Sequence, residues 1–257
     1  MNMRGVFAIF LAGLLALPIR AELPPLLDAA VKKISDDFDH WAYTQTYVEK
    51  NEKGKIVRES VVRFDPSKPY AEQYQPLTIN GLPPTEAQLK KYRRQGERRA
   101  RQIEAAENEG TTPTRKTLGE LMSLDHARLA ADDAEAATFE VPLKKEGNTR
   151  LPPEKFRVTA RVNKSLGAFE RIDVELRSPM RAELVVKIKS GAGALEFASV
   201  NPRYSPTLTA ITGGGAGSIL FVPVGRIYNV KRDEFQRVKP FGDRFQVKMG
   251  PLKTIDF

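Results

Sequence analysis

Apolar and polar residues alternate with a period of two along much of the chain after residue 155. In residues 156–162 (FRVTARV) and 172–176 (IDVEL), every second side chain is apolar, and the ones between are charged or polar. One-sided strands of this kind are typical of an antiparallel sheet with one buried face. Strand–helix–strand spacing does not occur here, which argues against a Rossmann fold or a TIM barrel. We expect further strands at 184–188, 194–200, 207–212, 218–224, 226–230 and 244–249, with turns between them that include 190–193 and 213–217.

Before that region the pattern changes from helix to strand. Apolar residues at helical spacing predict an amphipathic helix over 26–38. Aromatic, threonine and valine residues then dominate 40–50, and residues 56–64 (IVRESVVRF) continue the strand pattern. These two segments predict a hairpin across a turn at 51–54. A short third strand is expected within 70–79.

A second helix is expected after a pair of prolines. Thr85 and Gln88 have the spacing of a capping box, in which two side chains satisfy backbone N–H groups at the start of a helix. The helix then runs to about residue 109 with only a thin apolar stripe. Residues 118–124 fit either a short helix or an extended segment, and residues 138–143 (TFEVPL) fit a strand.

The N-terminal segment differs from the rest of the chain. Arg4 precedes an unbroken run of apolar residues and glycine over 6–17, and the small residue Ala21 follows where cleavage is expected. This order is typical of a secretory signal peptide. The run is short for a transmembrane helix, but its flanking residues match a cleavage site poorly, so an uncleaved anchor remains the alternative. We expect residues 1–21 to be a cleavable signal peptide and residues 22–257 to be one periplasmic domain.

The positive charge of the chain is concentrated in one segment. The formal charge is +9, from 41 Lys and Arg against 32 Asp and Glu. Two arginines lie in the signal segment, so residues 22–257 carry 39 cations against 32 carboxylates, a charge of +7. Residues 90–101 of the second helix hold seven cations and one carboxylate. These cations are Lys90, Lys91, Arg93, Arg94, Arg98, Arg99 and Arg101.

A cationic helix attracts an anionic partner. Three interpretations of this helix remain open, namely a solvated face, a contact with an anionic membrane surface, and a site for an envelope protein. Nucleic acid is not expected as a partner, because the export signal and the nearly neutral remainder of the domain both argue against it.

The residue types exclude several kinds of chemistry. The chain has no cysteine, so disulfides, thiolate metal sites and cysteine nucleophiles are excluded. His40 and His126 are the only histidines, and neither has a second histidine at metal-ligand spacing. The glycine run 213–217 precedes a strand and lacks the lysine of a phosphate loop, so it fits a hairpin connection or a lip beside a ligand site. We expect a non-enzymatic protein without catalytic residues, metal or cofactor.

Rows of apolar side chains at even spacing are the candidate ligand-binding residues. Each row lies on one face of its strand, and such a face either packs under a helix or lines a concave apolar site. The candidates are Trp41, Tyr43 and Tyr47 in the first strand, and Ile172, Val174, Leu176, Leu184, Val186 and Ile188 in the later strands.

The order of these elements resembles the periplasmic lipoprotein-carrier (Lol-type) superfamily. An export segment and an amphipathic helix precede the aromatic hairpin (WAYTQTYVEK, KIVRESVVRF), and a helix after Pro-Pro-Thr precedes the long run of strands. The segment RFDPSKPYAEQYQPLTINGLPPTEAQ is similar to one in exported bacterial proteins with a Phe-x-Pro, Gly-x-Pro-Pro pattern. The resemblance implies an α+β, β-rich fold, in which a curved antiparallel sheet forms an unclosed half-barrel with helices covering its concave face.

The resemblance also implies a cavity between the sheet and the helices that takes an acyl chain or another lipid. The expected function is therefore that of an exported protein that binds or carries a lipidic or apolar ligand. The alternative is an envelope adaptor or sensor domain that binds another protein through the basic helix, which is a helical insertion near 85–109.

Overall fold

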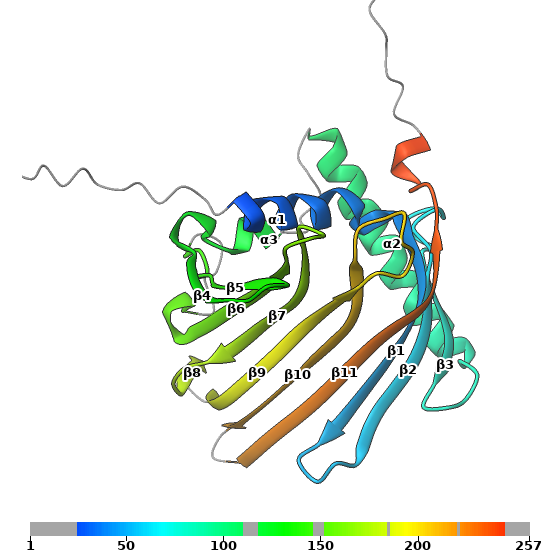
Figure 1. Cartoon of the computed structure of the whole chain (residues 1–257). Coiled ribbons are helices and arrows are strands. Elements are labelled where there is room, and N and C mark those ends of the chain that lie inside the picture. Colours follow the sequence, from blue (N-terminus) through cyan, green and yellow to red (C-terminus); the bar gives the residue numbers. More distant parts are fainter. Residues whose placement is uncertain (1–24, 110–117, 146–151, 184–185, 220–221, 245–257) are drawn as a thin grey trace, which may run out of the picture.

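One large antiparallel sheet dominates the molecule (Figure 1). The computed structural model describes residues 25–109, 118–145, 152–183, 186–219 and 222–244. The predicted signal segment, Leu184 and nearly all of the strand expected at 244–249 lie outside these residues. None of the described helices has the length and apolar character needed to cross a membrane.

The helices and the first three strands follow the predicted order, and several of the later expected segments belong to longer strands. The helices are α1 (Pro25–Asp37), α2 (Glu86–Asn108) and α3 (Leu118–Leu121), with short 3-10 turns at Phe38–His40, Leu124–His126, Pro153–Lys155 and Gly242–Arg244. The strands are β1 (Trp41–Asn51), β2 (Ile56–Phe64), β3 (Tyr74–Ile79), β4 (Arg128–Asp132), β5 (Ala136–Glu140), β6 (Phe156–Asn163), β7 (Ala168–Leu176), β8 (Met180–Glu183), β9 (Val186–Ala198), β10 (Thr207–Ile219) and β11 (Val222–Arg237).

The strands pair in the order β3-β2-β1-β11-β10-β9-β7-β6-β5-β4, and β8 pairs with β9 beside this path. Because β11 pairs with β1, the last strand joins the meander to the N-terminal hairpin. Within the described residues the end strands β3 and β4 do not meet, so the sheet stays open. The predicted fold class is confirmed as a β-rich α+β fold with an unclosed antiparallel half-barrel.

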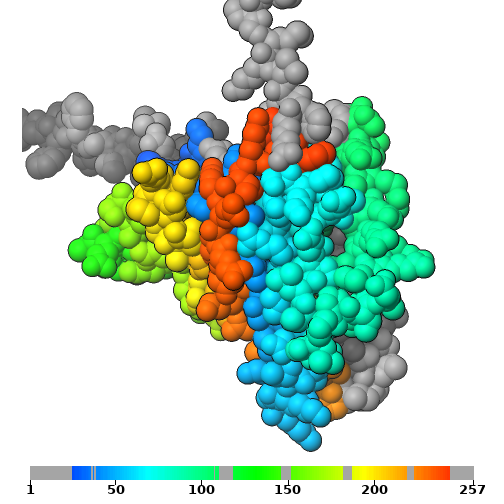
Figure 2. Space-filling view, turned by 90° about the vertical axis from the view of Figure 1, so that its right-hand side faces the viewer, coloured from blue at the N-terminus to red at the C-terminus, as the bar shows by residue number. Residues whose placement is uncertain are grey.

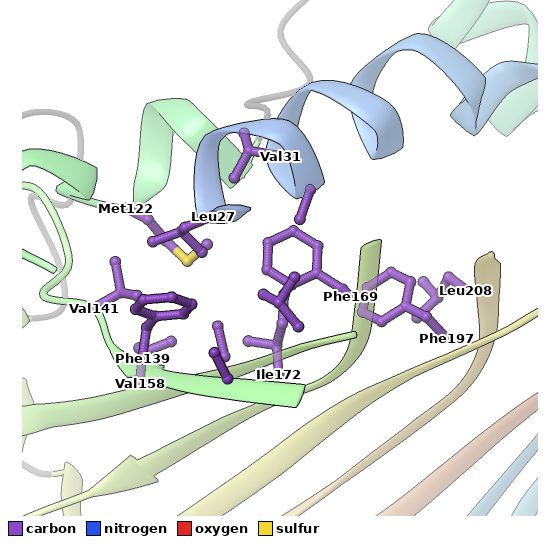
Figure 3. Close-up of a cluster of buried hydrophobic side chains, with 14 residues drawn as sticks. Leu27, Val31, Met122, Phe139, Val141, Val158, Phe169, Ile172, Phe197 and Leu208 are labelled. Atoms are coloured by element: carbon purple, nitrogen blue, oxygen red, sulfur yellow. The ribbon is translucent and has the colours of Figure 1, made fainter. Parts of the chain in front are cut away.

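Helix α1 covers one end of the inner face of the sheet, which we define as the face on which α1 packs. Leu27 and Ala30 are fully buried there, against Phe139 of β5 and Phe169 and Ile172 of β7 (Figure 3). Burying a leucine side chain is worth about 1.5–3 kcal/mol, so the apolar stripe of this short helix is enough to fix it on the sheet. The apolar residues that predicted this helix from their spacing are the ones that are buried.

A second buried cluster lies where α1 ends and β1 begins. Trp41, Tyr43 and Phe64 are buried together, and Phe235 of β11 packs on them. The indole Nε1 of Trp41 donates a hydrogen bond of 3.1 Å to the Asp37 carboxylate at the end of α1. The aromatic row of β1 therefore ties the helix to the centre of the sheet.

Helix α2 packs against β3, at the edge opposite β4 (Figure 1). The capping box is confirmed, because the backbone N–H of Thr85 donates to Gln88 Oε1 at 2.8 Å and the N–H of Gln88 donates to Thr85 Oγ1 at 3.4 Å. Gly96 is the buried residue of the helix. A Cβ at this position would lie 2.0 Å from the carbonyl oxygen of Ala71, so glycine is what allows the close approach.

Two turns inferred from glycine clusters are wrong. Residues 190–193 lie inside β9 and residues 213–217 lie inside β10, and each strand continues through its glycines. The reason is the pairing between the strands, since Gly193 pairs with Gly213 and Gly191 pairs with Gly215. The ladder hydrogen bonds hold these residues extended against their preference for turns.

Smaller differences concern short strands. The third strand, Tyr74–Ile79, lies within the segment expected, and residues 118–124 contain the short helix α3. Strand β4 (RLAAD) was not expected, because all five of its residues are exposed and no alternation marks them. Strand β8 was also not expected and pairs with the start of β9.

Candidate functional site

Beyond α1, the inner face of the sheet is built from rows of paired residues. The long strands β9, β10, β11, β1 and β2 extend past α1 (Figure 1). Residues that pair across antiparallel strands share one face. The row nearest the core is Ile172–Leu195–Ile211–Val230–Tyr47, the next is Val174–Gly193–Gly213–Tyr228–Glu49, and the third contains Gly191–Gly215–Arg226–Asn51.

The second and third rows have no side chains in their middle. Gly191, Gly193, Gly213 and Gly215, which we call the glycine floor, occupy neighbouring positions on β9 and β10. A Cβ added at Gly191 would meet only the Gly214 carbonyl oxygen and Leu176 Cβ, at 3.8 and 3.9 Å. These are ordinary van der Waals distances, so a Cβ fits above Gly191 without a clash. Gly215 is exposed and Gly191 is half-buried, so backbone is accessible at these two positions, where other rows carry side chains.

One side of the glycine floor is aliphatic. Val174 packs partly against the core under α1, and Leu176 is half-buried beside Gly191. Both side chains belong to β7, the strand next to β9. An apolar chain lying on the floor would have these two residues on one flank.

The other side of the glycine floor is aromatic and charged. Tyr228 is 38% exposed, and a Cβ at Gly213 would lie 2.3 Å from its Cζ, so the Tyr228 ring lies over Gly213. Arg226 pairs with Glu49 at 3.1 Å. The Tyr47 hydroxyl donates to Glu49 Oε2 at 3.1 Å. Polar groups therefore lie next to the tyrosines on this flank.

The environment of Tyr47 affects its ionisation. Burial raises the pKa of Tyr47, and the hydrogen bond to the Glu49 carboxylate raises it further because ionisation would place two negative charges together. The Arg58 guanidinium, 5.7 Å from the ring centre, opposes this shift. Tyr47 therefore remains a neutral hydrogen-bond donor on this flank.

The structure places the candidate ligand residues in three settings. Trp41, Tyr43 and Ile172 are buried in the two core clusters. Tyr47, Val174 and Leu176 are half-buried around the glycine floor, and Ile188 is half-buried farther along β9. Leu184 lies outside the described residues, and Val186 begins β9.

Sequence reasoning missed the glycines and the flank formed by Glu49, Arg226 and Tyr228. The signal was present, because runs of small residues at 190–194 and at 212–218 lie in two consecutive strands. Interpreting these two glycine-containing segments as turns excluded the possibility that they are strands that pair with each other.

A surface hollow of about 690 Å³ lies elsewhere, at the end of β5. It is lined mainly by charged residues, including Asp125, Arg128 and Lys145, and Arg177 forms an ion pair with Glu140 in its wall. The His126 ring lies here, with Nδ1 2.9 Å from Ser123 Oγ, a contact within one short turn. Within the described residues no further group hydrogen-bonds to this ring, so the pair does not form a catalytic triad.

The cations of α2 separate into two groups. Arg99 turns toward β3, where its guanidinium lies 4.2 Å from the centre of the Tyr74 ring and donates to the Tyr70 carbonyl at 3.1 Å. Burial lowers the pKa of Arg99, with the negative potential of Tyr74 opposing that shift. The other six candidates, Lys90, Lys91, Arg93, Arg94, Arg98 and Arg101, are exposed.

Among the described residues, no cluster of three or more histidine or carboxylate side chains has the arrangement of a metal site. Comparison of the chain with protein-family models, curated proteins and solved structures finds no match.

Proposed function

We propose that the chain is a non-enzymatic binding or carrier protein for a lipidic ligand, and that the apolar part of this ligand lies on the glycine floor. The observation that carries the proposal is the floor itself, four paired glycines on the inner face of an unclosed half-barrel, with room for a side chain above Gly191. Strands lie about 4.8 Å apart, so the distance from β7 across β9 and β10 to β11 is about 14 Å. An extended acyl chain fits along such a strip.

The two flanks suit an amphipathic ligand. Val174 and Leu176 offer apolar contact on one side, while Tyr47, Tyr228 and Arg226 offer hydrogen bonds and a cation on the other. Ligand sites of this kind are mostly apolar with a few polar groups that fix orientation. We infer that a polar or anionic head lies toward β11 and β1.

Two further observations support a carrier role. The order of elements resembles that of the Lol-type carriers, which hold acyl chains on a half-barrel. The apolar N-terminal segment has the pattern of an export signal, so we infer that the protein acts in the periplasm.

The test uses the fluorescent fatty acid cis-parinaric acid and two neighbouring substitutions. Gly191→Leu places a leucine side chain above the floor, whereas Ala192→Leu places the same side chain on the opposite face of β9. Displacing two methylene groups of the ligand costs about 1.6 kcal/mol, so Gly191→Leu should weaken binding about tenfold or more. Ala192→Leu should bind as the unmodified chain does.

Native mass spectrometry of the purified protein provides a second measurement. We expect a co-purified lipid on the unmodified chain and less of it on the Gly191→Leu variant. Absence of both fatty-acid binding and co-purified lipid would refute the proposed function. Equal loss in both variants would refute the glycine floor as the site.

A further inference from the structure

The inner side of α2 is fixed to the molecule by specific contacts. Gly96 lies against the carbonyl of Ala71, and Arg99 stacks on Tyr74 and donates to the Tyr70 carbonyl. Tyr92 and Ile103, which lie on the same side of the helix, are half-buried. These contacts set the rotation of α2 about its axis, so the side that faces away from the sheet is defined.

The opposite side of α2 carries a ridge of cations. At 100° per residue, Lys90, Lys91, Arg94, Arg98 and Arg101 fall within an arc of about 100°, centred opposite Gly96 and Tyr92. All five side chains are exposed. We call these five residues the cationic ridge. Eleven residue steps at 1.5 Å each give the cationic ridge a length of about 16 Å.

The cationic ridge is not neutralised by the rest of the described chain. In residues 25–109, 118–145, 152–183, 186–219 and 222–244, none of its five side chains forms an ion pair or a hydrogen bond. By contrast, Arg157, Arg161 and Arg171 on the sheet each pair with a carboxylate. Among residues 90–101, Glu97 is the single acidic residue. The potentials of the five cations therefore add.

We propose that the cationic ridge docks the protein on an anionic phospholipid surface. Protein interfaces are centred on aromatic and other apolar anchors with few charges, and the ridge has none of these. Headgroups in a bilayer are mobile and need no shape match, and each basic residue near an anionic surface adds to the attraction. Figure 2 shows α2 (green) projecting along one margin of the molecule beside the β2–β3 hairpin, where a flat surface can reach it.

One exposed apolar side chain close to α2 in the sequence supports a phospholipid surface as the partner. Leu82, four residues before α2, is 68% exposed, the highest value among the large hydrophobic residues described. Basic residues combined with an exposed apolar side chain are the usual composition of a peripheral membrane contact. The inference does not depend on the proposed ligand of the glycine floor, because the two sites share no residue.

The test is sedimentation of the full chain with vesicles of phosphatidylcholine alone or with added phosphatidylglycerol. Binding is expected to the mixed vesicles only and should fall as salt is raised, because ions screen exposed charges. The Lys90→Glu/Arg94→Glu/Arg98→Glu variant should lose on the order of 100-fold or more in partitioning, because each of the three basic residues contributes about fivefold.

A matched control variant distinguishes the effect of the cationic ridge on binding from the effect of net charge. Lys53→Glu/Lys231→Glu/Lys239→Glu changes the total charge equally, and its three positions are exposed. We expect it to keep most of the binding, while circular dichroism and Trp41 fluorescence verify that both variants are folded. Equal loss in the two triple variants, or no preference for the anionic vesicles, would overturn the proposal.

A site-specific probe gives an independent readout. Because the chain has no cysteine, a single environment-sensitive fluorophore can be placed at Ala105→Cys, which is exposed and in line with the cationic ridge. Its emission should shift to the blue on anionic vesicles, and the same label at Ala198→Cys should not respond. Charge-dependent crosslinking of α2 to an envelope protein without vesicle binding would instead identify a protein partner and refute the membrane contact.

Discussion

The guanidinium of Arg99 lies 4.2 Å from the centre of the Tyr74 ring, which makes one cation of the basic helix part of its attachment to the sheet. The same guanidinium donates to the carbonyl of Tyr70. Gly96, one turn earlier, completes this attachment through its contact with Ala71. The position of the six exposed cations therefore depends on Gly96 and Arg99, which lie on the opposite side of the helix.

The Gly96→Ala substitution tests this attachment. In an isolated helix alanine is favoured over glycine by about 1 kcal/mol, but here the new Cβ would lie 2.0 Å from the Ala71 carbonyl oxygen. We expect α2 to separate from residues 70–74, so amide hydrogen exchange should accelerate in both segments. Gln95→Ala, at an exposed neighbouring position, should leave exchange unchanged. Slower exchange in the Gly96→Ala variant would mean that helix propensity outweighs the contact.

The end of α1 is predicted to depend on Asp37. This carboxylate accepts the hydrogen bond from Trp41 Nε1 and pairs with Arg237, whose guanidinium lies over the rings of Trp41 and Tyr204. Hydrogen bonds to charged groups are worth about 1.5–3 kcal/mol, so Asp37→Ala should lower the free energy of unfolding by about 2 kcal/mol.

Intrinsic fluorescence measures this change directly, because Trp41 is the single tryptophan of the chain. We expect red-shifted emission and a lower urea midpoint for Asp37→Ala, and a smaller effect for Asp37→Asn, which keeps an acceptor for the indole. Lys32→Ala, on the exposed side of the same helix, should stay within about 0.5 kcal/mol of the unmodified protein. An unchanged Asp37→Ala variant would show that the packing of Trp41 alone holds this end of α1.

The turn between β4 and β5 is predicted to make stability depend on pH. The backbone N–H groups of Ala136 and Glu135 donate to the Asp133 carboxylate at 2.7 and 2.9 Å and, with Arg161, hold the pKa of Asp133 below its ordinary value. The unfolded chain therefore takes up this proton at a higher pH than the folded chain. The stabilisation by this carboxylate is fully present above the ordinary pKa of an aspartate, about 4. It is lost as the pH falls through the lowered pKa of Asp133 in the folded chain.

Urea unfolding at neutral and acidic pH tests whether the stabilisation by Asp133 decreases as the pH falls. Asp133→Asn should be less stable than the unmodified chain at pH 7, and the difference should narrow as the pH falls below 4. Asp125→Asn is the control, because Asp125 forms no hydrogen bond or ion pair with another described residue. A difference that stays constant with pH would show that the Asp133 carboxylate acts through its shape alone.

The elements that could be predicted are those whose own residues determine them. The stripe of Leu27, Ala30 and Val31 identifies α1, and the strict alternation of Val158, Ala160 and Val162 identifies β6. Thr85 and Gln88 mark the start of α2 because a capping box is local. In each case the element is determined by residues close together in the sequence, through a local hydrogen bond or through a regular spacing of apolar side chains.

The candidate site depends on long-range pairing and could not be predicted in the same way. Gly193 and Gly213 adopt an extended conformation because each pairs with the other strand, and Tyr228 covers Gly213 from a third strand. Similarly, the contact of Arg99 with the Tyr74 ring joins two elements far apart in space in the unfolded chain, and helical spacing alone does not predict it. The sequence pattern identifies which strands are present, and the register decides which side chains meet.

An open half-barrel keeps two strand edges, and unpaired edges are where sheets add strands from other molecules and aggregate. In this molecule β4 is only five residues long and has Arg128 and Asp132 at its ends. Strand β3 contains Pro76, which has no N–H to offer a new strand. Helix α2 packs beside β3. The protein can therefore keep its sheet open with less risk of polymerising through its edges.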